Sequence, residues 1–350
     1  MRLMICAIDI FVGDAVGNHC LGIARCAQRS GWEVRLYARN FDIGVADIRP
    51  ISALFDEIAP DDLLLVSYSI VDPQLDRLLA LPNRKACYFH GVTDPELLQE
   101  FEPRTAELCA EAIRQLPRLV GFDVLVANSH FTAGSLVQAV DNRPVHVIPP
   151  VFADMPGFER RRPRARSNGR RNLLMVGRVV PHKRIEDALE VLQVLRHDNV
   201  EVSLSIVGST PNHEYLRYLI NRARALGILE YLDFKGVLDD EDLLDCFEDS
   251  DVMLVMSRHE GFCVPVLEAM FRGMPALVRG GTAAEELCDA GDVYAPDATA
   301  GKWAAGVVRH LDGSSVDRAA RVSRALEVLD RASDSHWAEV LAFAREGGRK

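Results

Sequence analysis

The segment LLMVGRVVPHKRIEDALEVLQVL, residues 173–195, predicts a buried strand, a basic loop and a helix in direct succession. Residues 173–176 form an apolar run of the kind found in strands buried on both faces of a parallel sheet. The loop 177–184 leads into residues 186–195, whose apolar positions follow helical spacing. A strand followed by a crossover helix is the repeating unit of a doubly wound α/β domain.

The same alternation extends in both directions along the chain. Further strands are predicted at residues 3–8, 33–37, 63–67, 86–90, 124–127, 145–148, 202–207, 231–235, 252–256 and 276–278. Helices are predicted at residues 18–28, 96–115, 214–226, 241–247, 265–272 and 337–343. Two Rossmann-like, doubly wound domains facing a cleft are therefore expected. They span residues 1–155 and 172–330, joined by a linker at 156–171, and a C-terminal helix at 331–350 is expected to pack back on the first domain.

The composition is that of an ordinary globular protein of two domains. The 350 residues are 48% hydrophobic and 26% charged, and 40 Lys and Arg against 51 Asp and Glu give a net charge of -11. An acidic chain repels phosphate backbones, so we expect no nucleic-acid partner, although a local cationic pocket remains compatible with this charge. The eight cysteines form no CxxC pair, which favours a reducing cytoplasm. No apolar stretch reaches ~18 residues, so no membrane span is expected.

An arginine-rich stretch, GFERRRPRARSNGRR at residues 157–171, interrupts the alternation. It carries seven arginines and no apolar periodicity. The first interpretation is a solvated linker between domains. The second is a patch for anionic lipid headgroups, which would place a cytoplasmic protein peripherally at the inner face of the membrane.

Two loops at predicted strand ends carry residues suited to a phosphorylated sugar ligand. Arg178 and Lys183 lie beside a predicted helix N-terminus, where free N–H groups already favour anions such as a diphosphate. Two ordinary surface cations are the alternative. After the strand 252–256, Glu260 lies in a loop and Glu268 on an apolar helix, where a carboxylate needs a partner such as a sugar hydroxyl.

The spacing Glu260-x7-Glu268, with GRVVPHK about eighty residues upstream, resembles the retaining glycosyltransferases of the GT-B fold, family 4. The resemblance covers residues 172–292 closely. It implies a hexosyltransferase with a nucleotide-diphosphate sugar as donor, bound by the second domain, and a hydroxyl acceptor on the first. It implies no cofactor and no metal ion. The pair Asp249 and Asp251 is interpreted as a capping and turn element rather than a metal motif.

The resemblance also implies a role for individual residues. Arg178 and Lys183 would hold the donor diphosphate and neutralise the leaving group, Glu260 would contact the donor sugar near the reacting carbon, and Glu268 would bind the ribose hydroxyls. The donor-binding backbone would come from Gly261, Phe262, Cys263, Gly236, Val237 and Gly208, with Cys263 standing where many relatives have Gly. His90 would approach the transferred sugar, or else bond only to nearby backbone. Gly13, Asp14 and Ser129 are assigned to the acceptor side of the cleft, with a helix N-cap as the default role of Ser129.

Residues 13–18 and 88–93 are similar to bacterial mannosyltransferases of polysaccharide assembly. This similarity favours GDP-mannose as donor, then a UDP-hexose, and a glycan, lipid-linked or small-molecule acceptor in polysaccharide or glycoconjugate synthesis. Other functions remain open on the same architecture. One is a sugar-nucleotide epimerase or a phosphorylase, and another is a catalytically silent subunit that binds a nucleotide sugar.

Overall fold

The computed structural model describes residues 2–44, 47–152, 156–158, 171–313 and 318–346. It divides into two compact units. The first comprises Met1–Thr93, Glu107–Asp154 and Val328–Lys350, and the second Asp94–Ala106 and Met155–Glu327. Most of the arginine-rich stretch, with the lipid-binding patch considered for it, lies outside the described residues.

The described part of the first unit contains a seven-stranded parallel sheet in the order β3-β2-β1-β4-β5-β6-β7. Its apolar strands are buried on both faces, as their nearly continuous hydrophobic runs predict. The strands are β1 (Arg2–Ile10), β2 (Glu33–Phe41), β3 (Ile48–Pro50), β4 (Leu63–Tyr68), β5 (Lys85–Phe89), β6 (Val124–Ala127) and β7 (His146–Val147).

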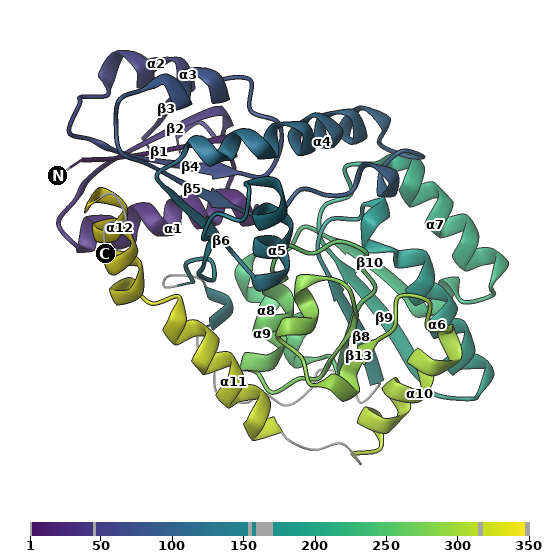
Figure 1. Cartoon of the computed structure of the whole chain (residues 1–350). Coiled ribbons are helices and arrows are strands. Elements are labelled where there is room, and N and C mark those ends of the chain that lie inside the picture. The colour runs from purple at the N-terminus through teal and green to yellow at the C-terminus, as the bar shows by residue number, and fades with distance from the viewer. Residues whose placement is uncertain (1, 45–46, 153–155, 159–170, 314–317, 347–350) are drawn as a thin grey trace. The chain divides into compact units, whose positions relative to one another are not determined.

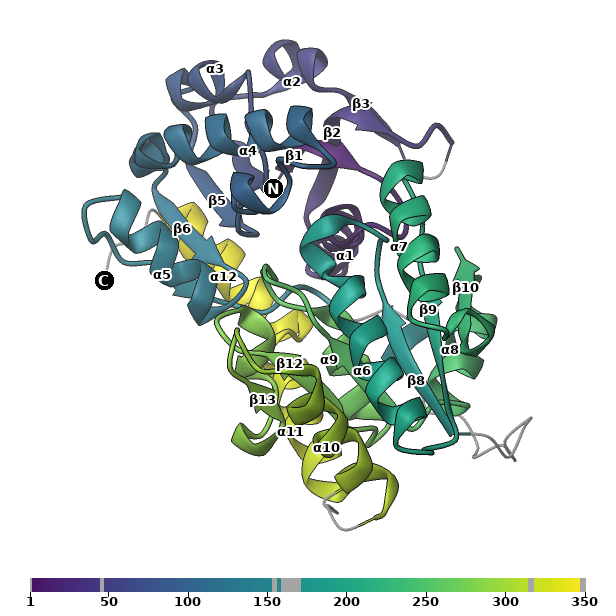
Figure 2. The same ribbon diagram turned by 90° about the vertical axis from the view of Figure 1, so that its right-hand side faces the viewer.

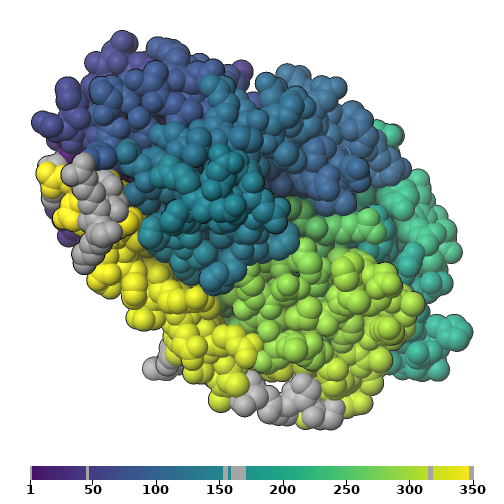
Figure 3. All heavy atoms as spheres, in the orientation of Figure 1, coloured from purple at the N-terminus to yellow at the C-terminus, as the bar shows by residue number. Residues whose placement is uncertain are grey.

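Helices from both ends of the chain cover this sheet (Figure 1). The C-terminal helix packs beside the first helix, and Trp337 and Leu341 are buried with Cys20 and Ile23 in one core. The yellow C-terminal atoms accordingly adjoin the purple N-terminal ones in Figure 3. Besides the end of α11, described below, the helices that contribute residues to this unit are α1 (Ala15–Arg29), α2 (Ile51–Glu57), α3 (Leu75–Ala80), α4 (Pro103–Gln115), α5 (His130–Ala139) and α12 (Asp334–Glu346).

The second unit has the same kind of architecture (Figure 2). Its described residues contain a six-stranded parallel sheet in the order β10-β9-β8-β11-β12-β13. The strands are β8 (Arg171–Val176), β9 (Val202–Val207), β10 (Leu232–Gly236), β11 (Val252–Val255), β12 (Ala276–Arg279) and β13 (Val293–Tyr294). The helices are α6 (Ile185–His197), α7 (His213–Ala225), α8 (Asp240–Glu248), α9 (Val264–Phe271), α10 (Ala300–Leu311) and α11 (Arg318–Arg331), the last of which ends in the first unit.

Each sheet has a point at which the strand order reverses, and ligands of doubly wound sheets bind outside the carboxyl ends of the strands there. In the second unit this point lies between β8 and β11. The loops that follow these two strands touch each other, since the backbone N–H of Arg258 donates to the carbonyl of His182 at 2.9 Å. The topology therefore brings together two loops that are about eighty residues apart in the sequence.

The prediction of one helix over residues 96–115 is wrong. A 3-10 turn at Pro95–Leu97 is followed by non-helical residues, and α4 begins only at Pro103. Proline disfavours helical backbone at the residue before it, which explains the interruption at Glu102. The short edge strands β3 and β13 were not predicted. No helix in the described residues is both long and apolar enough to span a membrane.

Candidate functional site

Three glycines, Gly177, Gly208 and Gly236, lie at the carboxyl ends of three neighbouring strands of the second unit. The N–H of Gly177 donates to Val207 at 2.9 Å, and that of Gly208 donates to Gly236 at 2.8 Å. A Cβ on Gly208 would lie only 2.1 Å from the carbonyl oxygen of Gly177, and its φ of +142° is one that side chains rarely adopt. Gly208 therefore has to be glycine for the chains after β8 and β9 to approach so closely.

The loop after β8 presents the two predicted cations differently. Arg178 is exposed, and its side chain has no hydrogen bond or ion pair with any described residue. Lys183 ends the 3-10 turn Pro181–Lys183, and its Nζ donates to Oε1 of Glu260 at 2.7 Å. The structure thus joins two of the predicted site residues directly, while it leaves the guanidinium of Arg178 available to an anion.

The pair of Lys183 and Glu260 is largely shielded from water. The side chain of Glu260 is 9% exposed and that of Lys183 is 20% exposed. Burial is the largest single influence and lowers the pKa of Lys183, but the charge and hydrogen bond of Glu260 and the nearby Cys263 together outweigh it, and the pKa is raised. Lys183 is therefore a fixed cation at neutral pH, as a group that stabilises a leaving diphosphate has to be.

A partly buried ionic network connects this loop to neighbouring elements. Asp187 on α6 accepts a hydrogen bond from Arg184 at 2.8 Å and another from Arg279 at the end of β12. Arg279 also donates to the carbonyl of Met256 at 2.8 Å, and burial lowers the pKa of its guanidinium. The network ties together the carboxyl ends of β11 and β12 and the start of α6, so it fixes the two loops that carry Lys183 and Glu260.

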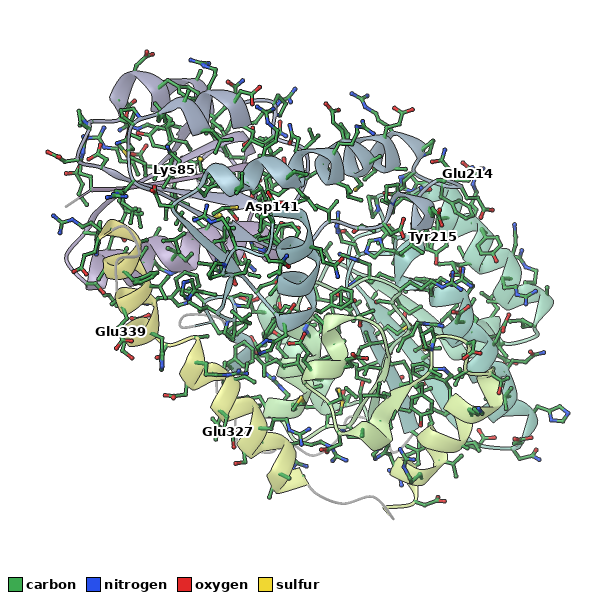
Figure 4. The ribbon with its side chains drawn as sticks, viewed as in Figure 1. Lys85, Asp141, Glu214, Tyr215, Glu327 and Glu339 are labelled. Carbon is green, nitrogen blue, oxygen red and sulfur yellow. The ribbon has the colours of Figure 1, made fainter. Side chains whose placement is uncertain are left out.

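Tyr215, which lies on α7 (Figure 4), bonds to the start of α6. Its hydroxyl donates to Glu186 and accepts from the N–H of Ile185 at 3.3 Å. The ring of Tyr215 lies 5.2 Å from that of Phe101, whose carbonyl accepts from the side chain of Asn212 at 2.8 Å. Residues 94–106 thereby belong to the packing of the second unit.

Glu268, on α9, is buried to 6% exposure, and its carboxylate makes no hydrogen bond with the described residues. Burial raises the pKa of this carboxyl to about 7, the nearby Arg272 lowers it in part, and the acidic Asp240 adds to the rise. A buried carboxylate without donors is costly unless a ligand supplies them. Its interaction with Asp240 puts it near the start of α8, which follows the predicted donor-binding residues Gly236 and Val237.

The other predicted donor residues surround the start of α9. Cys263 is the N-cap of α9 with φ +75°, a left-handed backbone that glycine adopts without strain. Phe262 and Cys263 are buried, whereas Gly261 is half-buried. Val237 is 76% exposed. Burial raises the pKa of the Cys263 thiol well above its usual range, so this thiol is a poor nucleophile.

In the first unit, His90 follows β5 and is held by its neighbours. Its Nε2 lies 2.7 Å from Oγ of Ser67, and its carbonyl accepts from the amide of Asn128 at 3.3 Å. Burial lowers the pKa of His90 to about 3, so the ring is neutral at physiological pH. His90 is thus suited to hydrogen bonding rather than to carrying charge. Ser67, on β4, was not identified from the sequence.

A cluster of rings packs behind His90. The ring of His19 stacks on Tyr88 at 4.0 Å and lies 5.2 Å from His90, and Trp337 of α12 lies 5.3 Å from His19. Nδ1 of His19 accepts from the N–H of Val151 at 3.2 Å. The C-terminal helix therefore contributes to the surroundings of His90, although it is about 250 residues away in the sequence.

The predicted acceptor residues lie at helix starts in the first unit. Asp14 caps α1 and accepts from the N–H of Val16, while Gly13 has φ +82° with no atom near the place of a Cβ. Ser129 caps α5, and its buried hydroxyl accepts from the N–H of Thr132 at 3.1 Å. The hydroxyl of Ser129 is thus engaged in the helix cap.

Asp249 and Asp251 lie at the end of the second sheet opposite to the loops that carry Lys183 and Glu260. Asp251 accepts from Arg171 at 2.8 Å and from the N–H of Asn172 at 2.9 Å, both at the start of β8. Asp249 is the C-cap of α8. The carboxylate of Asp251 thus holds the start of β8, and Asp249 ends α8, as expected for a capping and turn element.

The second unit is similar in sequence to known glycosyl transferases. Residues 158–324 match the model of the family described as Glycosyl transferases group 1. Mannosylfructose-phosphate synthase of Agrobacterium fabrum is 26% identical over 45% of this chain and 37% of its own length. Glycogen synthase of Mycobacterium tuberculosis is 32% identical over 55% of this chain and 47% of its own length. The chain thus covers less than half of these two relatives.

The whole chain is similar in fold to a solved structure, that of Anabaena HepE in complex with UDP-glucose. The TM-score is 0.74 with 16% identity, and the match covers 98% of each chain. At this identity the likeness establishes the fold alone. Together with the two parallel sheets, it shows that the chain has the two-domain, Rossmann-like GT-B fold.

Proposed function

We propose that this protein is a retaining glycosyltransferase that moves a hexosyl group from a nucleoside diphosphate sugar to a hydroxyl acceptor. The observation that carries the proposal is the ion pair of Lys183 and Glu260, largely shielded from water, on the loop that also carries Arg178, whose side chain makes no hydrogen bond or ion pair with the described residues. Both loops follow the strands between which the strand order of the second sheet reverses. The match of residues 158–324 to group 1 glycosyl transferases supports it.

Breaking a bond between a sugar and a phosphate develops negative charge on the leaving diphosphate. We assign the stabilisation of that charge to Arg178 and Lys183, without a metal ion, since preorganised cations in a water-poor site act strongly on developing charge. Glu260 would both orient Lys183 and face the sugar. The departing phosphate would help to deprotonate the acceptor, and His90, neutral at physiological pH, would serve as a hydrogen-bonding group for the sugar.

For the donor we propose GDP-mannose first and a UDP-hexose second. The similarity of residues 13–18 and 88–93 to bacterial mannosyltransferases supports the first. A fold neighbour solved with UDP-glucose supports the second. The acceptor would be a glycan, a lipid-linked saccharide or a small molecule of bacterial polysaccharide or glycoconjugate synthesis.

The proposal is tested by following GDP-mannose and UDP-hexoses by NMR spectroscopy in the presence of candidate acceptors. We expect one donor to be consumed with an acceptor and the product to keep the anomeric configuration of the donor. An inverted product would contradict retention. A donor sugar altered without acceptor would indicate an epimerase, and binding without turnover of any donor would favour a silent binding subunit.

Donor affinity is expected to rise with pH through neutrality because of Glu268. Its pKa of about 7 means that the ionised fraction grows about tenfold between pH 6 and pH 8. The ionised carboxylate only accepts hydrogen bonds, so the ribose hydroxyls, which donate them, should bind it more tightly than they bind the protonated carboxyl. Isothermal titration with the nucleotide sugar, whose diphosphate does not titrate in this range, should therefore show an affinity that rises about tenfold between pH 6 and pH 8. Glu268→Gln should bind more weakly with a flat profile, and a flat wild-type profile would contradict the assignment.

A further inference from the structure

A short turn, Pro156–Phe158, lies directly against the carboxylate of Glu268. A Cβ on Gly157 would lie 2.0 Å from Oε1 of Glu268 and 2.9 Å from its Cδ. The backbone angles of Gly157 lie outside the left-handed region, so close approach alone is what demands a glycine here. Any side chain at position 157 would have to move the carboxylate.

Arg272 fixes this turn to α9. Its Nη1 donates to the carbonyl of Gly157 at 2.7 Å and to the carbonyl of Glu268 at 2.9 Å. The ring of Phe158 packs edge-on against Phe271, with centroids 5.7 Å apart. A hydrogen bond to the carbonyl of Gly157 and a ring contact of the next residue, Phe158, thus hold the turn against α9.

The contact restricts where the Glu268 carboxylate can lie. The backbone of Gly157 occupies one side of it, and the described residues supply no hydrogen-bond donor to its oxygens. A carboxylate that is buried and confined in this way loses little conformational freedom when a ligand binds. Two oxygens in a fixed orientation match two neighbouring hydroxyls, as on a ribose.

We propose that Gly157 and Arg272 are positioning residues for nucleotide recognition, which hold the Glu268 carboxylate where it accepts hydrogen bonds from the ribose hydroxyls of the donor. The inference rests on the proposed function and extends it to the turn Pro156–Phe158, which lies outside the loops that carry Arg178 and Glu260. The specificity it assigns is for ribonucleoside over deoxyribonucleoside diphosphates.

The test measures the affinities of UDP, GDP and their 2′-deoxy counterparts by isothermal titration. The wild type is expected to prefer the ribonucleotide about tenfold, which is what one hydrogen bond to a charged group provides. Gly157→Ala should displace the carboxylate and remove this preference while binding the deoxynucleotide nearly as well as the wild type. Gly301→Ala is the matched control, because a Cβ there meets no atom within 4 Å, and it should keep the preference.

A second variant keeps the test decisive if Gly157→Ala does not fold. Arg272→Lys retains the positive charge but not the shared guanidinium contact, and it should reduce the preference for the ribonucleotide several-fold. The inference is overturned if either folded variant discriminates like the wild type while Glu268→Gln does not. If Glu268→Gln also discriminates normally, the ribose role of Glu268 itself, and with it this part of the proposed function, is wrong.

Discussion

Replacing Lys183 with methionine should lower the rate of sugar transfer by a factor of at least about 100. The substitution keeps most of the length of the side chain and removes the cation. A single preorganised donor to a developing oxyanion contributes about 10²–10³ to the rate, and the pKa of Lys183 is raised, so the charge that is lost is a permanent one. The effect should be mainly on kcat, since this charge matters most when the diphosphate leaves.

The substitution should also destabilise the protein, because it leaves the carboxylate of Glu260 buried without its ion partner at 2.7 Å. We expect a loss of about 1–3 kcal/mol, below the range for fully buried pairs because Lys183 is partly exposed. The double variant Lys183→Met, Glu260→Gln should recover stability in urea unfolding but not activity. Normal turnover in the single variant would remove Lys183 from the proposed site.

Replacing Gly208 with alanine should produce the largest loss of stability, about 3 kcal/mol or more. The new Cβ would lie 2.1 Å from the backbone oxygen of Gly177, and backbone cannot rotate away as a side chain can. The φ of +142° adds strain for any residue with a side chain. Nucleotide binding should be lost together with the geometry of the three strand ends.

A second alanine variant, Gly227→Ala, separates the stability lost through steric overlap from the stability lost through an unfavourable φ. Gly227 also has a positive φ, +69°, but a Cβ there would meet no atom within 4 Å. Gly227→Ala should therefore cost only the left-handed penalty, about 1–2 kcal/mol. Equal losses for the two variants in urea unfolding would show that the close approach of Gly208 to Gly177 is not important for stability.

Most of the architecture could be predicted because strands buried on both faces have an unmistakable pattern. The run at residues 173–176 and its counterparts placed the strand ends, and hence the loops of Arg178 and Glu260, in nearly the right positions. Local pattern failed where tertiary context decides. The edge strand β13 has two residues and no pattern of its own. The apolar pattern of α4 extends to residues before Pro103, but the helix begins only at that proline.

The contacts that assemble the site could not be predicted. The bond from Lys183 to Glu260 joins residues 77 positions apart, and that from Arg279 to Asp187 joins residues 92 apart. Neither follows from spacing, because each depends on which strands become neighbours. Gly157 carries no local signal at all, since its backbone angles suit any residue and only the nearby carboxylate demands a glycine.

The most direct test of the central claim is the affinity of GDP and UDP for the wild type and for Arg178→Ala by isothermal titration. The side chain of Arg178 is exposed and makes no hydrogen bond or ion pair with the described residues, so its loss should not perturb the fold. We expect at least one nucleotide to bind and Arg178→Ala to weaken it about 10- to 100-fold. Arg217→Ala, an equal loss of charge on α7, should bind normally. Failure of both nucleotides to bind the wild type, or equal affinity in Arg178→Ala, would contradict a donor site at these loops.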